Sequence, residues 1–267
     1  MNVGETFSWP DGDIILRCTH DTGGRDFRVH KAFLSFVSPV FKDMFGIPQP
    51  SSSPSDIDIV DLSDPPRALE LILRFIYPSA VSPIVDDLAI ISEALILTDK
   101  YDIQVVRSRL RSSLVELAKT EPLRVYAVAC RFGFEDEMKI ASSHTLSINV
   151  PALTQLPDEF NFITVAAYHR LIHFHARHRD AVLAIITESL SIAPGFGYVN
   201  RADRVAMTFR ADLKRHIMDI IMKGTPLDYK SFALALKTEH GIDVEADCTG
   251  NDVRSILDKI YALNLTV

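Results

Sequence analysis

The sequence predicts an α+β fold, in which a short β-sheet with helical hairpins precedes an all-helical C-terminal region. Short β-type runs all lie before Ser63, whereas most later segments carry apolar residues at helical spacings of three and four. No glycine-rich phosphate loop and no alternation of strands with helices follows. The chain of 267 residues is long enough for two domains, and we predict them at 1–120 and 121–267.

The stretch 26–45, DFRVHKAFLSFVSPVFKDMF, predicts a strand that leads directly into a tight helical hairpin. Ser38 separates the two helical runs and is a suitable N-cap for the second, with Pro39 at its first position. Apolar residues recur at spacings of three and four through both runs: Phe33, Leu34, Val37, Val40, Phe41, Met44 and Phe45.

The other elements follow from the same rules. Residues 13–18 predict a first strand, and Gly23-Gly24 predicts a hairpin turn that pairs it with 26–29. Residues 57–62 predict a further short strand, after which Ser63 or Asp64 is expected to cap a helix. Predicted helices span 65–77, 87–100, 103–117, 123–132, 134–146, 162–190, 202–222 and 252–263.

Composition excludes several classes of function. Hydrophobic residues make up 47% of the chain and the net charge is -7, without a basic block that would indicate nucleic-acid or membrane-surface binding. The three cysteines are far apart, which favours a reducing compartment over a disulfide framework. The polar N-terminus does not resemble a signal peptide. We therefore expect the protein in the cytoplasm, the nucleus or both.

Several motifs together resemble the BTB/POZ domain over roughly the first 120 residues. They are the Asp at the first strand in Gly12-Asp13-Ile14, His30-Lys31 after the second strand, Ser38-Pro39, Met44-Phe45 and the Asp-Lys-Tyr ending at Tyr101. The segments TFSWPDGDIILR and FGIPQP resemble the corresponding sequences of the fungal (basidiomycete) group of BTB proteins. The helix pair within 123–146 resembles the start of the helical BACK extension that follows many BTB domains.

The resemblance implies a homodimer that pairs through the first helix and the N-terminal segment. The residues themselves support this, because apolar side chains on a helix with about 100° between residues cannot all face one core. Phe7 and Trp9 are expected either to hold the N-terminus on a partner subunit or to cap their own core. The predicted dimer interface is Phe7, Trp9, Phe33, Leu34, Phe36 and Val37.

The resemblance also implies a charged pocket made by Asp13, His30 and Lys31, near a groove in the dimer. A partly buried Asp13–Lys31 ion pair is expected there, because charged groups taken out of water need partners. The pocket is either a place where a partner peptide docks or an ion pair that only holds strand to helix.

Many BTB families act as adaptors that present a bound substrate to a cullin-type ubiquitin ligase, and the resemblance implies this role here. Family members that bind cullin often carry a hydrophobic-x-acidic element after the third long helix. Its nearest matches are Ile84-Val85-Asp86 and Ile91-Ser92-Glu93, and no Kelch, MATH or zinc-finger segment is present to bind substrate. The alternative is a self-associating scaffold or transcription-linked assembly protein without a ligase role. Neither role needs a cofactor or makes the protein an enzyme.

A metalloenzyme is a third hypothesis, resting on His169, His173, His175 and His178. The first two have the i, i+4 spacing of a helical metal pair. The last two project about 180–240° round the helix from them, so one four-ligand site is not expected. We therefore predict a partly exposed amphipathic helix and no stoichiometric zinc.

Overall fold

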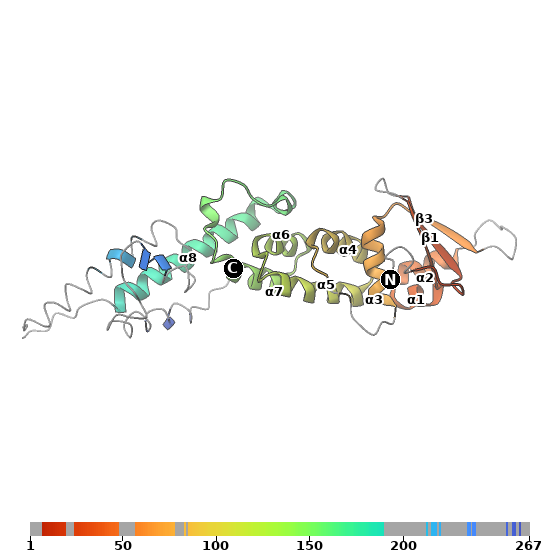
Figure 1. Ribbon diagram of the computed structural model, residues 1–267, viewed down its shortest axis with the longest axis horizontal. Coiled ribbons are helices and arrows are strands. Elements are labelled where there is room, and N and C mark those ends of the chain that lie inside the picture. The colour runs from red at the N-terminus through yellow and green to blue at the C-terminus, as the bar shows by residue number, and fades with distance from the viewer. Residues whose placement is uncertain are drawn as a thin grey trace, which may run out of the picture. The chain divides into compact units, whose positions relative to one another are not determined.

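The computed structural model describes residues 7–19, 24–47, 57–77, 83 and 85–189, with scattered positions between 212 and 262 (Figure 1). It divides into two compact units, Met1–Leu117 and Ala118–Val267, which we call unit 1 and unit 2. The helices predicted at 202–222 and 252–263 lie outside the described residues, apart from single positions. The predicted domain boundary at residue 120 stays a prediction.

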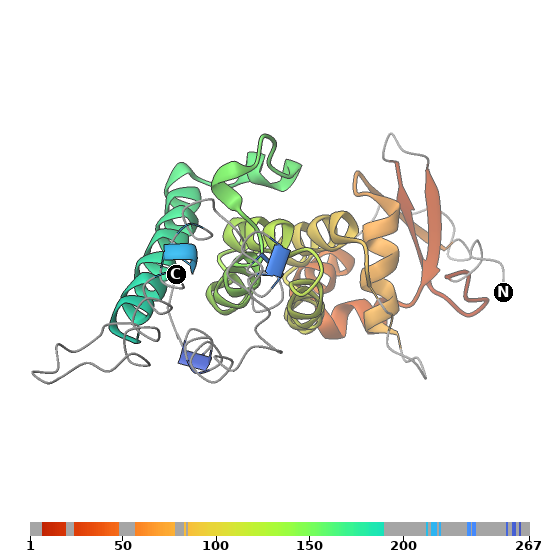
Figure 2. The same ribbon diagram turned by 60° about the vertical axis from the view of Figure 1, so that its left-hand side comes forward.

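Unit 1 contains a three-stranded sheet in the order β2-β1-β3. Strand β1 (Ile14–Cys18) pairs antiparallel with β2 (Arg25–Val29), as predicted, and parallel with β3 (Asp58–Leu62). Burial alternates along β1, so Ile14, Leu16 and Cys18 face the core. The helices of unit 1 lie on one side of this sheet (Figures 1 and 2).

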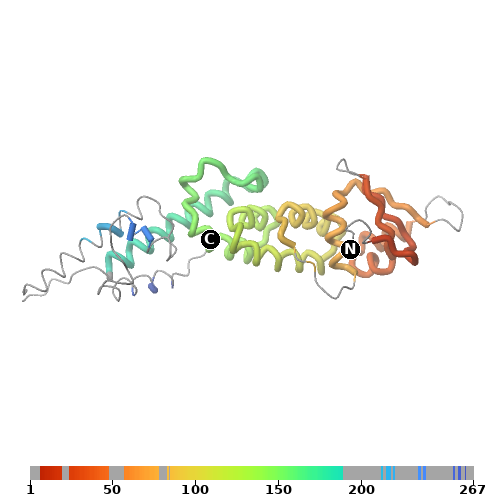
Figure 3. Tube along the Cα trace, in the orientation of Figure 1, coloured from red at the N-terminus to blue at the C-terminus, as the bar shows by residue number. Residues whose placement is uncertain are grey.

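Helices α1 (Lys31–Val37) and α2 (Pro39–Gly46) form the predicted hairpin, whose path is clear in the trace of Figure 3. Ser38 is confirmed as the N-cap of α2, because its hydroxyl oxygen accepts the Phe41 N–H at 3.0 Å. The same buried hydroxyl donates to the Tyr101 carbonyl at 2.5 Å. One serine thus caps α2 and attaches the hairpin to the end of a later helix.

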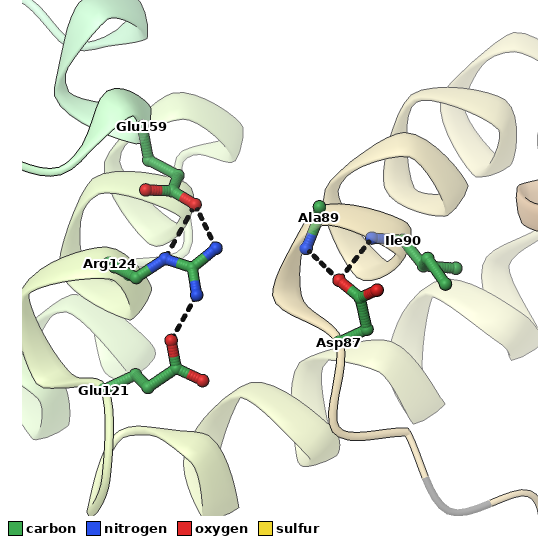
Figure 4. A network of polar contacts seen from close by, with 6 residues as sticks. All are labelled: Asp87, Ala89, Ile90, Glu121, Arg124 and Glu159. Carbon is green, nitrogen blue, oxygen red and sulfur yellow. Dashed lines mark hydrogen bonds and ion pairs between the residues drawn. The ribbon is translucent and has the colours of Figure 1, made fainter.

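Helices α3 (Pro66–Ile76), α4 (Leu88–Lys100) and α5 (Gln104–Leu117) complete unit 1. Asp87 caps α4 by accepting the Ala89 N–H at 2.9 Å (Figure 4). The cap predicted for α3 was wrong, since Pro65 precedes the helix and makes no side-chain cap. The Asp64 carboxylate is buried and accepts instead from the Lys100 ammonium at 2.7 Å and from the Tyr101 hydroxyl.

Unit 2 begins with the predicted helix pair, α6 (Pro122–Phe132) and α7 (Glu135–Thr145). Gly133 ends α6 in the left-handed conformation with φ of 69°, which favours glycine. The prolines beyond α7 interrupt the helix, leaving the short 3-10 turns η1 (Val150–Ala152) and η2 (Asp158–Phe162). The long helix α8 (Val165–Ser189) follows.

An arginine on α6 ties η2 to the helix pair (Figure 4). The Arg124 guanidinium donates twice to Glu159 Oε1, at 2.9 and 2.6 Å, and also pairs with Glu121. Burial alone would raise the pKa of Glu159, and the hydrogen bond from Arg124 instead brings that pKa below its ordinary value. The segment that leads into α8 is therefore fixed by a charged contact.

In the part of the chain that the structure describes, no helix has the length and apolar character needed to cross a bilayer.

Candidate interaction surface

Aromatic rings from three separate segments of unit 1 meet around Tyr77, at the end of α3. Trp9 stacks on the Tyr77 ring with centroids 5.7 Å apart and an angle of 8°. Phe33 of α1 contacts the same ring at 4.8 Å and Phe7 contacts it at 5.5 Å. His30 contacts both Trp9, at 6.1 Å, and Phe33, at 5.7 Å. We call Phe7, Trp9, His30, Phe33 and Tyr77 the aromatic cluster.

Tyr77 also holds the start of α1 through its hydroxyl. The His30 backbone N–H donates to the hydroxyl oxygen at 2.7 Å, and the hydroxyl lies 3.0 Å from His30 Nδ1. Burial raises the pKa of Tyr77, so the hydroxyl keeps its proton and can donate it to Nδ1. Sequence reasoning treated Tyr77 only as a helix end. The only sequence feature that could have pointed to its role is an aromatic residue directly before the helix-ending Pro78.

The N-terminal segment is attached to the open edge of β2. The Arg28 N–H donates to the Phe7 carbonyl at 2.9 Å, and the Trp9 N–H donates to the Arg28 carbonyl at 3.2 Å. The Arg28 guanidinium donates to the Gly12 carbonyl at 3.1 Å. A Cβ on Gly12 would lie 2.9 Å from the Val29 carbonyl oxygen, so the close approach requires glycine. The open edge of β2 is therefore covered at Arg28 by its own chain.

The six residues of the predicted dimer interface separate into buried and exposed side chains. Phe36 is 91% exposed, Trp9 42% and Phe33 39%, while Val37 is partly buried. Leu34 is fully buried in unit 1, and Phe7 is only 5% exposed. Leu34 therefore belongs to the core of its own unit rather than to a free surface. Phe7 is likewise buried in its own unit, and a contact of the N-terminal segment with a partner subunit stays a prediction.

The predicted Asp13–Lys31 ion pair is not formed. The Asp13 carboxylate accepts the Lys31 backbone N–H at 2.7 Å, while the Lys31 ammonium pairs with Asp58 of β3. The first N–H groups of a helix lack partners within the helix, so the Asp13 carboxylate satisfies one of them at the start of α1. The His30 ring contacts neither of these groups and lies with Nε2 3.4 Å from Asp11 Oδ1 and Nδ1 3.0 Å from the Tyr77 hydroxyl. A partner peptide at this pocket stays a prediction.

The two matches to a cullin-binding element differ in their accessibility. Ile91 is fully buried in unit 1, so it cannot offer an apolar side chain to a partner. In the other match Val85 is partly buried and Asp86 exposed, while residue 84 lies outside the described residues. Ile91 therefore does not fit the apolar position of such an element, and the match at 84–86 stays a prediction.

The four histidines of α8 lie in two different environments. His169 and His173 are exposed, with parallel rings whose centroids are 6.2 Å apart. His175 Nε2 lies 2.9 Å from Thr145 Oγ1, and His178 is buried, 5% exposed. Burial lowers the pKa of both, that of His175 to about 4. Among the residues that the structure describes, no three histidine, cysteine or acidic side chains gather as a metal site.

Two cysteines in the described ranges are free thiols. Cys18 is buried in β1, and burial raises the pKa of its thiol to about 11. Cys130 of α6 lies with Sγ 3.3 Å from the Met138 sulfur, and burial raises its pKa as well. Neither thiol therefore has the lowered pKa of a reactive nucleophile.

Comparison with known protein families gives a match over residues 10–117, to the model described as the BTB/POZ domain. The matched range covers the whole three-stranded sheet, the α1–α2 hairpin and helices α3 to α5. BTB/POZ domains generally mediate contacts between proteins. Residues 10–117 are therefore similar to the BTB/POZ domain, and unit 1, with its small sheet and helical hairpin, has the α+β fold of that domain.

Proposed function

We propose that this protein is a dimeric, non-enzymatic adaptor that links a bound partner to a cullin-type ubiquitin ligase. The exposure of Phe36, 91% of its surface on a helix of only seven residues, carries the dimer part of the proposal. Exposed aromatic side chains that lie together on a folded domain mark interfaces. Phe33, one helical turn before Phe36 on α1, is 39% exposed. Trp9, which meets Phe33 around Tyr77, is 42% exposed.

A second copy of unit 1 is the partner that this surface suits best. Identical subunits that meet face to face form a closed two-fold pair, the commonest arrangement of soluble oligomers. The rigid stack of Trp9 on Tyr77 and the contact of Phe33 with the same ring fix the aromatic side chains before association. Little side-chain entropy is then lost on binding, which favours a stable dimer.

Co-purification of two differently tagged copies tests the dimer. Wild-type chains produced together are expected to co-purify through either tag. A Phe36→Asp chain should lose this association, because a charge would be buried in the interface. Val105→Asp on α5, where Val105 is 53% exposed, is the matched control and should keep it. Separate behaviour of the wild-type chains would refute the dimer.

The ligase part of the proposal is supported by the BTB/POZ family match and by the exposed Asp86 before α4. We expect a cullin N-terminal region to bind the α1–α2 hairpin together with the segment from Tyr77 to Asp87. Calorimetric titration of the whole protein should give a dissociation constant in the micromolar range, where ~1 μM corresponds to about -8 kcal/mol. Absence of binding at tens of micromolar would exclude the ligase link while leaving the dimer untouched.

The burial of Ile91 favours a second candidate function, a self-associating scaffold or transcription-linked assembly protein. This role needs the dimer but no cullin contact. Both functions fit a cytoplasmic or nuclear protein, since the free thiols require no oxidising compartment. The α6–α7 helix pair supports the proposal of a BACK-like extension. The sequence before β1 supports the proposal that the protein belongs to the basidiomycete group of BTB proteins.

A further inference from the structure

Strand β3 lies at an edge of the three-stranded sheet in unit 1, next to β1 on one side only. The Thr19 N–H donates to the Leu62 carbonyl at 2.8 Å, so the backbone of Leu62 faces β1. Because backbone polar groups alternate in direction along a strand, the backbone of Val60 faces β1 as well. The N–H and C=O groups of Ile59 and Asp61 therefore point away from the sheet, and no described residue bonds to them.

The side chains of Ile59 and Asp61 lie on the face of the sheet opposite the core. Their partners in the parallel register are Ile15 and Arg17 of β1, whereas the next residue, Leu62, is buried on the core face. Ile59 is 46% exposed, and Asp61 is exposed as well. The helices of unit 1 lie on the core side of the sheet (Figure 2). We call the outer edge of β3, with Ile59 and Asp61, the β3 edge.

The charges across this face alternate in sign and end at the β3 edge. The Arg17 guanidinium donates to both carboxylate oxygens of Asp26 on β2, at 3.0 and 3.1 Å. Asp26 raises the pKa of Arg17 first, and Asp61, on the other side of Arg17 in the register, contributes less. In the described ranges the Asp61 side chain makes no hydrogen bond or ion pair of its own. A further strand beside β3 would therefore be matched by a cation opposite Asp61.

Charge also decides which occupant the β3 edge suits. A second copy of β3 offers no cation to Asp61, since its five residues include no lysine or arginine. The β2 edge of a second copy is covered at Arg28, and Arg25 pairs with Glu70. A carboxylate at an exposed edge also repels nucleic acids and anionic membranes, which bind through basic residues. A partner protein with a basic residue on an extended segment is therefore the best match.

We propose that the β3 edge binds an extended segment of a partner protein as an additional strand of the sheet. The backbone of that segment pairs with the outward N–H and C=O groups of Ile59 and Asp61. A lysine or arginine of the segment lies opposite Asp61, and a β-branched residue two positions away lies opposite Ile59. Main-chain hydrogen bonds then supply affinity, and the two side-chain positions supply selectivity.

The length of β3 sets the size of the segment. Its five residues, Asp58–Leu62, span about 17 Å at about 3.3 Å per residue, which an extended segment of similar length covers. The inference goes beyond the function proposed for unit 1, because the β3 edge lies on the sheet rather than on α1. It needs neither the dimer nor cullin.

The experiment uses the full chain and a fluorescein-labelled nonapeptide with a central lysine, a valine two positions away on either side, and threonine elsewhere. This symmetric sequence can pair with β3 in either direction. Fluorescence anisotropy should show saturable binding. Asp61→Lys should weaken it at least fivefold, because attraction across the strands becomes repulsion. Asp43→Lys, the same charge change at an exposed position of α2, is the matched control and should stay within twofold of wild type.

Two further peptides test the inference without depending on the stability of one variant. A peptide with a central glutamate should bind the Asp61→Lys protein at least fivefold better than it binds wild type. The lysine peptide with methyl groups on its five central backbone nitrogens should not bind the wild-type protein, because it has lost the donors that an added strand needs.

Four results would overturn the inference. The lysine peptide could fail to bind at hundreds of micromolar, or its methylated form could bind equally well. The Asp43→Lys control could lose as much affinity as Asp61→Lys. Finally, Ile59→Lys could convert a dimeric chain to a monomer in light scattering, which would identify a second copy of the protein as the occupant of the β3 edge.

Discussion

Helices α1 and α2 form one hairpin, yet their aromatic side chains have opposite environments. Phe41 of α2 is fully buried and stacks on Tyr101 with ring centres 4.3 Å apart. Phe36 of α1, five positions earlier, is 91% exposed. Leu34 is the single buried residue of α1. The first helix therefore buries only Leu34 completely, and its Phe36 side chain is left for another contact.

The contrast shows how one apolar pattern serves both folding and binding. The buried Ser38 hydroxyl connects α2 to Tyr101, and Asp64 and Lys100 then fix the end of α4. These contacts attach α2 to the end of α4, while Phe36 of the preceding helix stays exposed.

The largest expected effect is a difference in stability between two alanine variants, one at the buried Phe41 and one at the exposed Phe36. Phe41→Ala should lower the free energy of unfolding of unit 1 by about 3–5 kcal/mol, because it leaves a cavity beside Tyr101. Phe36→Ala should change the intrinsic stability by less than about 0.5 kcal/mol, as expected for a surface position. Urea unfolding at two protein concentrations separates intrinsic stability from the contribution of association. Equal losses in both variants at both concentrations would contradict the contrast.

The same division between buried and exposed residues extends to the histidines of α8. The pKa of His175 falls from 6.5 to about 4, first through burial and then through the nearby His178. The unfolded chain therefore takes up a proton at a higher pH than the folded chain. The stability that neutral His175 provides is complete above pH 6.5 and declines toward pH 4. By pH 5 the decline is on the order of 2 kcal/mol.

Urea unfolding of the whole protein at pH 7.5 and pH 5 measures this decline. His175→Gln should reduce the difference between the two pH values, since glutamine keeps a donor toward Thr145 and does not titrate. His169→Gln, at an exposed position of the same helix, is the control and should leave the difference unchanged. An unchanged difference in the His175 variant would show that other groups account for the acid sensitivity.

A smaller effect concerns the two acidic residues near the start of α1. Asp13→Ala should cost about 1 kcal/mol, as loss of a helix-terminal acceptor usually does. Asp13→Asn should cost less, because the amide oxygen can still accept the Lys31 N–H. A double-mutant cycle between Lys31 and Asp58 should give a coupling of about 0.2–1 kcal/mol, typical of a partly exposed ion pair. A larger coupling of the Lys31 side chain to Asp13 would restore the ion pair predicted from sequence.

Local features of the fold could be predicted from the sequence because they depend on neighbours along the chain. The helical hairpin, the Ser38 cap, the Asp87 helix start and the α6–α7 pair all follow from periodicity and capping chemistry. Long-range pairings could not be predicted in this way. These pairings depend on which segments meet in space. They include the parallel register of β3 on β1, the ion pair of Lys31 with Asp58 and the contacts of Asp64.

The candidate site shows the same limit. Helical spacing identified the apolar residues of α1 but could not decide which of them faces the core, and Leu34 was assigned to the wrong side. Tyr77 was missed because its importance comes from three segments that meet around it. Residues that act through distant partners carry no signal in their own stretch of sequence.

Light scattering of the purified full chain over a wide concentration range tests the central claim, that the exposed face of α1 joins two copies of the protein. At tens of micromolar the wild-type protein should scatter with twice the mass of one chain, which is 29.8 kDa. Phe36→Asp should give the mass of a single chain with an unchanged circular dichroism spectrum, and the control Val105→Asp should keep the doubled mass. A well-behaved wild-type monomer at these concentrations, or a Phe36→Asp chain that stays dimeric, would contradict the account.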